Sequence, residues 1–201
     1  GSLAGEDVIF DGVVRQLGIR RGRNEEHMLD LVQALAYTDL PAGRGVGIVT
    51  QSGGAGVLMA DRAEELGLEV PHLSSDTAAV LKSAIPAFGA TGNPVDITGQ
   101  FLAEPEILLN SVNAVLDDPS VDIAIVWLQL MEGYADLLID LFTQIKLKAQ
   151  KPFIVCWVAA SDLALRRLGE IGIATMRGAD PAIEAVAGLV QYREARDAWR
   201  A

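Results

Sequence analysis

From Arg44 onward, short apolar segments alternate with segments of helical periodicity, and this alternation constrains the fold more than any other feature of the chain. Apolar strands separated by amphipathic helices are typical of a parallel sheet with both faces covered. Because crossovers between parallel strands are right-handed, the pattern predicts an α/β fold with a doubly wound parallel sheet. The expected strands are residues 45–50, 68–70, 95–98, 123–128, 153–158 and 173–176, and the expected helices are 56–66, 76–84, 104–116, 134–149, 161–171 and 181–201.

The first forty residues differ from the rest, because they contain helical patterns and no strand pattern. Residues 6–17 carry apolar side chains close to helical spacing, and Asn24 is placed to cap a second helix over 25–36. Pro41-Ala42-Gly43 then ends the helical pattern before the first expected strand. We therefore expect a helical segment and linker over 1–40, packed less firmly than a sheet domain over 44–201.

Composition excludes several functional classes. The net charge of −11 argues against a nucleic-acid interface and against an acidic membrane surface, since both require basic patches. No apolar run approaches the roughly 18 residues of a membrane span, and no signal peptide is visible at the start. The single cysteine, Cys156, lies in an apolar run, which predicts a buried structural thiol and a reducing, cytoplasmic location. No cluster of His, Cys and Asp has ligand spacing, so no metal site is expected.

A glycine-rich turn follows the first expected strand, with the sequence Thr-Gln-Ser-Gly-Gly-Ala-Gly over residues 50–56. Ser52 can cap the following helix, and the glycines let an anion approach backbone N–H groups at the positive helix end. We expect a phosphate site formed by Ser52, Gly53, Gly54, Ala55 and Gly56; the alternative is an ordinary tight turn. The turn does not match a dinucleotide-binding fingerprint, because the third glycine of that motif is missing. It does not match a phosphate-binding loop of the Lys-Ser/Thr type either, because no lysine follows.

A nucleophilic role for Ser52 is disfavoured. The turn loosely resembles a nucleophile elbow, but Thr50 replaces its first glycine. Only His27 and His72 could serve as a base, and neither lies in a late loop.

The segment over residues 92–99 contributes the second candidate site. Asn93-Pro94 enforces an extended entry into the expected strand, and Asp96 lies near its carboxyl end. In a doubly wound sheet ligands bind at that edge, so Asn93 and Asp96 are expected to line the pocket. The alternative for Asp96 is a structural carboxylate that caps nearby backbone N–H groups. Glu132, in the loop after the most apolar strand, is a further candidate for a catalytic acid.

Several separated motifs together resemble one known family. Residues 47–58, 64–68 and 92–99, with Lys-Pro-Phe-Ile-Val at 151–155, are similar to nucleoside-diphosphate-forming acyl-CoA synthetases, which are relatives of succinyl-CoA synthetase. The resemblance covers nearly the whole chain. It implies a flavodoxin-like succinyl-CoA-ligase domain at 44–201 and, at 1–40, the helical tail of a preceding flavodoxin-like domain.

The resemblance also implies a reaction. In this family acyl-CoA and phosphate give an acyl phosphate, a histidine takes the phosphoryl group, and a nucleoside diphosphate receives it. Two helix amino termini hold the phosphohistidine, and residues 52–56 match the second of these. The phosphohistidine itself is expected before Gly1, so no catalytic residue is expected in this chain. CoA, ATP or ADP, and Mg²⁺ are expected to bind the parent enzyme, none of them to this fragment.

The implied partners are phosphate or acyl phosphate and the other parts of the same ligase. These parts are CoA-binding, phosphohistidine and ATP-grasp domains or subunits, and a homo-oligomer is possible. Two alternatives stay open: a flavodoxin-like module that binds a mononucleotide or flavin, and a non-catalytic interaction domain. The first would need aromatic side chains in the ligand loops, for which Phe101, Tyr134 and Trp157 are the candidates.

Overall fold

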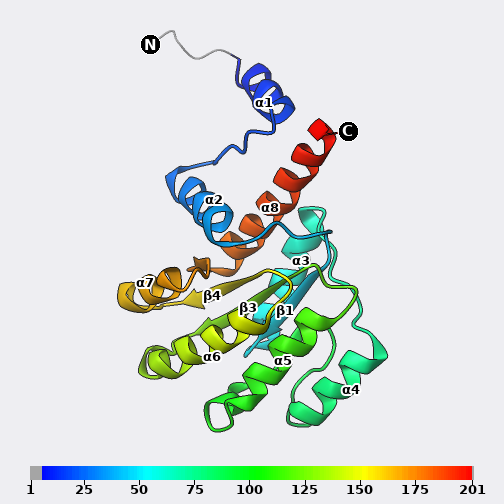
Figure 1. Ribbon diagram of the computed structural model, residues 1–201, viewed down its shortest axis with the longest axis vertical. Helices are drawn as coiled ribbons and strands as arrows, with labels where there is room; N and C mark the ends of the chain where they lie inside the picture. Colours follow the sequence, from blue (N-terminus) through cyan, green and yellow to red (C-terminus); the bar gives the residue numbers. More distant parts are fainter. Residues whose placement is uncertain (1–5, 201) are drawn as a thin grey trace.

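The computed structural model describes residues 6–200 and contains one five-stranded parallel sheet (Figure 1). Its strand order is β2-β1-β3-β4-β5, so β1 lies between β2 and β3, the two strands that follow it in the sequence. This is the order of flavodoxin-like folds and places a topological switch point at β1. The predicted fold class is therefore confirmed. The strands are β1 (Val46–Thr50), β2 (Val95–Asp96), β3 (Ile123–Gln129), β4 (Phe153–Val158) and β5 (Thr175–Met176).

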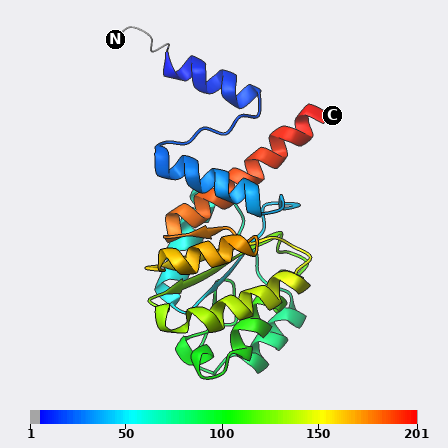
Figure 2. The same cartoon turned by 60° about the vertical axis from the view of Figure 1, so that its left-hand side comes forward.

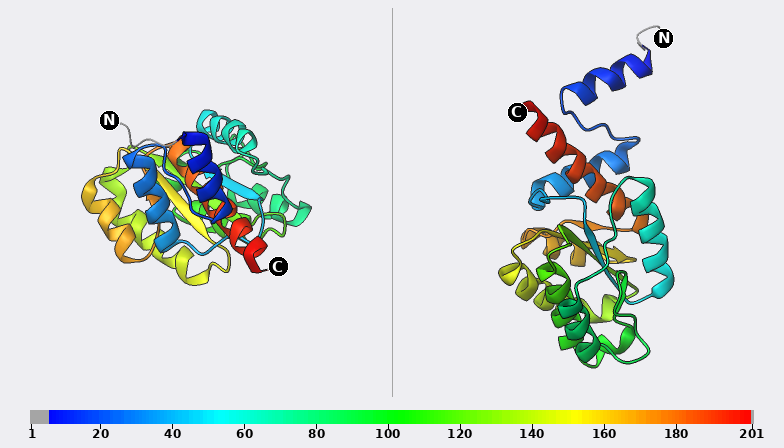
Figure 3. Two further views of the ribbon diagram at one scale, coloured as in Figure 1. Left: turned by 90° about the horizontal axis from the view of Figure 1, so that it is seen from above. Right: turned by 90° about the vertical axis from the view of Figure 1, so that its right-hand side faces the viewer.

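Helices cover both faces of the sheet, and each face has its own apolar core (Figure 3). One core joins the sheet to α4 (Ser75–Ala84), α5 (Glu106–Asp117), α6 (Ala135–Lys148) and α7 (Asp162–Glu170). The other joins it to α3 (Gly53–Glu65) and α8 (Ala179–Arg200). Two short 3₁₀ helices, Gly99–Leu102 and Glu132–Tyr134, follow β2 and β3. Because both faces are buried, the central strands are apolar along their length, as the sequence pattern predicted.

One expected strand is absent and two are shorter than expected. Residues 68–70 form only an isolated bridge, in which Glu69 pairs with Gly45. The ladder cannot extend further because Pro71 has no N–H to donate. β2 and β5 are two residues long each and lie at the sheet edges. The helix expected from residue 56 begins at Gly53 instead, which places Gly53 and Gly54 inside its first turn.

The two N-terminal helices pack to different degrees. α2 (Glu25–Tyr37) lies against α8, with Ala34 fully buried in the core and Asn24 capping the helix as predicted. In contrast, α1 (Asp7–Gln16) projects from the body (Figure 2), and Val14 is its one buried residue. The apolar side chains of α1 therefore have few contacts, and α2 shares the core of the sheet domain. The domain boundary near residue 40 stays a prediction.

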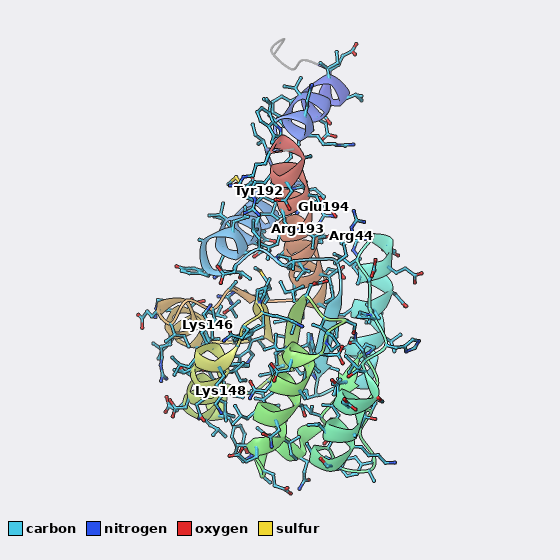
Figure 4. The ribbon with its side chains drawn as sticks, turned by 45° about the vertical axis from the view of Figure 1, so that its right-hand side comes forward. Arg44, Lys146, Lys148, Tyr192, Arg193 and Glu194 are labelled. Carbon is cyan, nitrogen blue, oxygen red and sulfur yellow. The ribbon has the colours of Figure 1, made fainter. Side chains whose placement is uncertain are left out.

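An ion pair fixes α8 to the start of the sheet. Arg44, just before β1, donates from Nε and a terminal nitrogen to the two carboxylate oxygens of Glu194 at 2.7 and 2.9 Å (Figure 4). The same guanidinium donates to the backbone oxygen of Gly67 at 3.1 Å. This contact joins α8, β1 and the end of α3 at one point. Over residues 6–200, no helix is both long and apolar enough to cross a membrane.

A substitution at Gly47, in β1, tests how closely α5 packs on this strand. A Cβ at this position would lie 2.3 Å from Val115 Cγ1 and 3.1 Å from Val121 Cγ1. Because both neighbours are β-branched and buried, we expect Gly47→Ala to lower the free energy of unfolding by about 1–3 kcal/mol. The control is Gly169→Ala on α7, where a Cβ meets nothing within 4 Å and no loss is expected. Urea unfolding of both variants measures the difference, and equal stabilities would contradict this packing.

Asp118 supplies a second test, because its buried carboxylate accepts hydrogen bonds from two different loops. Burial raises its pKa, but hydrogen bonds from Ser120, Thr77 and Ser74 outweigh burial and hold the pKa well below its usual range. Ser74 N and Ser120 N donate to it at 2.8 and 2.9 Å. A lowered folded-state pKa stabilises the fold above the unfolded value of about 3.9, and this stabilisation is lost as the pH falls further.

We expect Asp118→Asn to lower the free energy of unfolding by about 1–3 kcal/mol at pH 7, since one buried donor loses its acceptor. The gap between wild type and variant should narrow as the pH falls below about 4. Asp117→Asn is the control, because Asp117 is exposed and adjacent. A gap that is constant from pH 7 to about pH 3 would show that the Asp118 charge does not contribute.

Candidate functional site

The carboxyl edge of the sheet is the candidate site, and its loops have unusual backbone geometry. Three non-glycine residues have a positive φ in the described chain: Thr98 (58°), Leu130 (55°) and Ala159 (60°). Each lies one or two residues beyond the end of β2, β3 or β4. Such conformations are uncommon outside glycine and concentrate at functional sites. Their position marks the edge at which doubly wound sheets bind ligands.

The amino terminus of α3 presents free backbone donors at this edge. Gly56 N donates to Ser52 O at 3.1 Å and is the first amide in the helical ladder. The amides of Gly53, Gly54 and Ala55 precede it and have no acceptor within the helix. Gly53 and Gly54 are exposed. These three N–H groups lie at the positive end of the helix dipole, the geometry that binds oxyanions.

Ser52 holds the N-cap position, but its hydroxyl makes no cap hydrogen bond, contrary to the sequence-based expectation. Thr50 organises the turn instead. Its hydroxyl accepts from Ser52 N at 2.9 Å and donates to Ser52 O at 3.0 Å. The Ser52 hydroxyl therefore stays available to a ligand.

The glycines of the turn have different roles. A Cβ on Gly54 would meet nothing within 4 Å, so this position needs no glycine for packing. A Cβ on Gly56 would lie 2.8 Å from Pro94 Cβ and 3.2 Å from Thr50 Cγ2. Gly56 therefore lets α3 approach the segment that enters β2, whereas Gly54 keeps the helix end open toward solvent.

Asp96 lies beside this helix end. Its Oδ1 accepts from Thr98 N at 2.9 Å, and a Cβ built on Gly53 would lie 3.3 Å from its Oδ2. The carboxylate thus stabilises the strained turn at Thr98, as the structural alternative predicted. It also places a negative charge next to the amides of α3. A phosphate bound there experiences attraction from the helix and repulsion from Asp96.

The sequence-predicted pocket residue Asn93 has a structural role. Its Oδ1 accepts from Ile48 N at 2.9 Å, and its Nδ2 donates to Val46 O and Pro71 O at 2.8 and 3.1 Å. These contacts complete the backbone hydrogen bonding of β1 where β2 does not reach. Since its polar atoms are occupied toward the amino end of β1, we leave Asn93 out of the proposed site.

The loops after β3 and β4 hold one another in place. Glu132 Oε2 accepts from Ser161 N at 3.0 Å, and the Ser161 hydroxyl caps α7 by accepting from Ala164 N. Glu132 was a candidate catalytic acid in the sequence, but here its carboxylate accepts a hydrogen bond from the backbone. Gln51 is a feature that the sequence analysis missed: its Nε2 approaches Gln129 O at 3.4 Å, and its buried Oε1 has no hydrogen-bond partner among residues 6–200.

The other reactive side chains do not contribute to this edge. His27 lies in the first turn of α2, where its Nδ1 accepts a hydrogen bond from Arg23 N. Burial, together with the nearby Arg23, lowers the pKa of His27. His72 lies before α4, where its backbone oxygen accepts from Ser120. Cys156 is a buried free thiol, as predicted, and burial raises its pKa to about 12. Within residues 6–200, no group of three or more His, Cys, Asp or Glu residues could hold a metal ion.

Comparison with known proteins identifies related chains. The model of the Ligase-CoA domain family matches residues 46–198. The chain is 36% identical over 125 residues to the alpha subunit of acetate–CoA ligase [ADP-forming] II of Pyrococcus furiosus, covering 62% of this chain and 27% of that protein. It is 29% identical over its whole length to the alpha subunit of the isozyme I from the same organism, covering 43% of that subunit.

Solved structures agree. A protein from Pyrococcus horikoshii OT3 superposes with a TM-score of 0.83 at 27% identity, over 96% of this chain and 45% of that chain. An acetyl-coenzyme A synthetase of Ca. Korarchaeum cryptofilum superposes with a TM-score of 0.82 at 26% identity, over 98% of this chain and 43% of that chain. The chain thus spans less than half the length of each of these four proteins.

The charge of Asp96 gives a test of the site. We expect Asp96→Asn to bind inorganic phosphate about two- to fivefold more tightly, because a competing charge next to the helix end is removed. The same change should lower stability by about 0.3–1 kcal/mol, since a carboxylate near a helix amino terminus is stabilising. Asp61→Asn, exposed on the same helix, changes the net charge equally and is the control. Amide shifts of residues 53–55 during phosphate titration report affinity; equal affinities in both variants would contradict the site.

Proposed function

Since the chain belongs to the Ligase-CoA domain family, we propose that it is part of a nucleoside-diphosphate-forming acyl-CoA synthetase, in which it holds a phosphoryl group. The proposed reaction converts acyl-CoA, phosphate and a nucleoside diphosphate into acid, CoA and a nucleoside triphosphate. The relatives named above as acetate–CoA ligases [ADP-forming] support this class of reaction. The acyl group of this protein's substrate is not part of the proposal.

One observation carries the proposal: the open amino terminus of α3 lies at the carboxyl edge of the sheet. The amides of Gly53, Gly54 and Ala55 have no acceptor within the helix, and a Cβ at Gly54 would meet nothing within 4 Å among the described residues. A related synthetase has been solved with phosphate and ADP, which supports a phosphate-handling role for the fold. Residues 52–56 are therefore our candidate phosphoryl site.

The site acts by electrostatics alone. Preorganised backbone donors stabilise charge that develops on the transferring oxygens, and they need no proton transfer. Neither His27 nor His72 lies at this edge, so the histidine that carries the phosphoryl group is proposed to come from another part of the enzyme. Asp96, beside the helix end, disfavours tight binding of free phosphate and so favours release after transfer.

The remaining components of the reaction are assigned to the rest of the enzyme. We propose that CoA, ATP or ADP, and Mg²⁺ bind to other domains or subunits, which also supply the opposing surface of the site. Residues 1–40 are proposed to be the tail of a preceding domain, consistent with the exposed apolar side chains of α1. A cytoplasmic location is proposed from the single buried thiol, Cys156.

A flavin-binding module is the less supported alternative. A flavin needs aromatic side chains that can stack on it, but Phe101 and Trp157 are fully buried in the core that the sheet shares with α5 and α6. Tyr134 is the one exposed side chain among the three aromatic candidates. An interaction domain without chemistry would keep the sheet but bind no phosphate, so the phosphate titration above separates it from our proposal.

The proposed function is tested by Gly54→Val in the full-length ligase. A side chain at the helix end should block close approach of the phosphoryl group and slow phosphohistidine turnover by about 10²-fold or more, as loss of an oxyanion donor does. The fold should survive, because the position is open.

Gly169→Val on α7 is the matched control, since it places the same side chain on a helix in open space away from the site. Rapid-quench measurement of the phosphoenzyme compares the two variants. Wild-type turnover in Gly54→Val, with its stability unchanged, would show that this helix end is only structural.

A further inference from the structure

Gln51 lies at the switch point of the sheet. It is the first residue after β1, and its Nε2 donates to the backbone oxygen of Gln129, the last residue of β3, at 3.4 Å. β1 and β3 are neighbours in the sheet, and the strand order reverses between them (Figure 1). Doubly wound sheets bind ligands outside the carboxyl ends of the strands at this switch point. The side chain of Gln51 therefore lies where a ligand of this fold is expected.

The Gln51 amide is poorly satisfied in this position. Its distance of 3.4 Å from the Gln129 oxygen exceeds the usual range of about 2.7–3.2 Å for N–H···O hydrogen bonds. The other amide atom, Oε1, is buried and has no hydrogen-bond partner among residues 6–200. Exchanging the two amide atoms would not help, because Oε1 would then face the Gln129 oxygen. Since an unpaired buried polar atom costs free energy, this arrangement of the side chain is unfavourable.

The same residue directly precedes the candidate phosphoryl site. Gln51 is followed by Ser52, the N-cap residue of α3, and then by the amides of Gly53 and Gly54. A side chain at the position before the N-cap often lies along the first turn of the helix. Gln51 is only half-buried, so its side chain is not enclosed by the core. One glutamine thus stands between the end of β3 and the open end of α3.

We propose that Gln51 is a further phosphate-binding residue, an inference that rests on the proposed function. When a phosphoryl group binds at α3, the Gln51 amide leaves the Gln129 oxygen and donates from Nε2 to a phosphoryl oxygen. The side chain thereby exchanges a long neutral hydrogen bond for a charge-assisted one, which is stronger. Oε1 leaves its buried position in the same movement. Both changes favour the bound state, and no proton is transferred.

A purely structural role for Gln51 makes a different prediction for stability. If the side chain served only to join β1 to β3, Gln51→Met would destabilise the fold, because methionine has a similar shape but no donor. Our proposal predicts an unchanged or higher urea midpoint, since methionine buries no unpaired oxygen. The control is Gln100→Met: Gln100 follows β2 at the same edge, is exposed, and donates from Nε2 to Glu104.

The binding test titrates the ¹⁵N-labelled chain with inorganic phosphate, and with sodium chloride at equal ionic strength. Phosphate should shift the side-chain Nε2 signals of Gln51 together with the backbone amides of residues 53–55, while those of Gln100 stay unchanged. Gln51→Met should weaken phosphate binding about three- to tenfold, the net effect of one charge-assisted bond gained and one weak bond lost. Gln100→Met should bind phosphate within about twofold of wild type.

The outcomes separate this inference from the proposed function. If residues 53–55 shift but the Gln51 side chain does not, or if Gln51→Met binds phosphate as tightly as wild type, Gln51 is no ligand and the phosphoryl site stands. A clearly lower urea midpoint for Gln51→Met would show that the residue is structural. If neither the backbone amides nor the side chain shifts, the site and this inference both fail. The Gln51 signal is measured in wild type, so the test does not depend on the folding of a variant.

Discussion

The close contact between Gly56 and Pro94 sets the position of the helix on which the proposed function depends. With no side chain at Gly56, α3 approaches the entry to β2 closely enough that a Cβ would lie 2.8 Å from the proline. This fixes the helix end at the carboxyl end of β1, the strand at which the order of the sheet reverses and whose switch point lies between β1 and β3. The free amides of the first turn therefore lie at the ligand edge, where Gly53 and Gly54 are exposed and Gly54 has no packing role.

The charges at the same edge explain why we propose that other parts of the ligase complete the site. Asp96 brings a negative charge to the helix end, and the left-handed turns at Thr98, Leu130 and Ala159 hold the loops in conformations that other residues must stabilise. A single helix end contributes only about 0.3–1 kcal/mol to binding an exposed charge. Firm binding of a phosphoryl group thus needs a second surface, which agrees with a chain that spans less than half of its relatives.

Sequence periodicity predicted the central strands well because they are buried on both faces and bounded by breakers. The strand at 153–158 follows Pro152 and was predicted with its observed bounds. Residues 68–70, Leu-Glu-Val, were also predicted as a strand, but Pro71 and their position at the sheet margin leave only a bridge. The turn at 50–56 was found from its glycines, yet the sequence could not show which glycine packs and which is open. Asn93 and Asp96 share one motif, and only the fold reveals that their side chains serve different ends of β1 and β2.

The most direct test of the central claim is the structure of the full-length ligase trapped with its phosphoryl group bound. Our account predicts phosphoryl oxygens within about 2.7–3.2 Å of backbone nitrogens in the first turn of α3, at Gly53, Gly54 or Ala55. A phosphoryl group held throughout the reaction by side chains elsewhere, with this helix end facing only solvent, would contradict it.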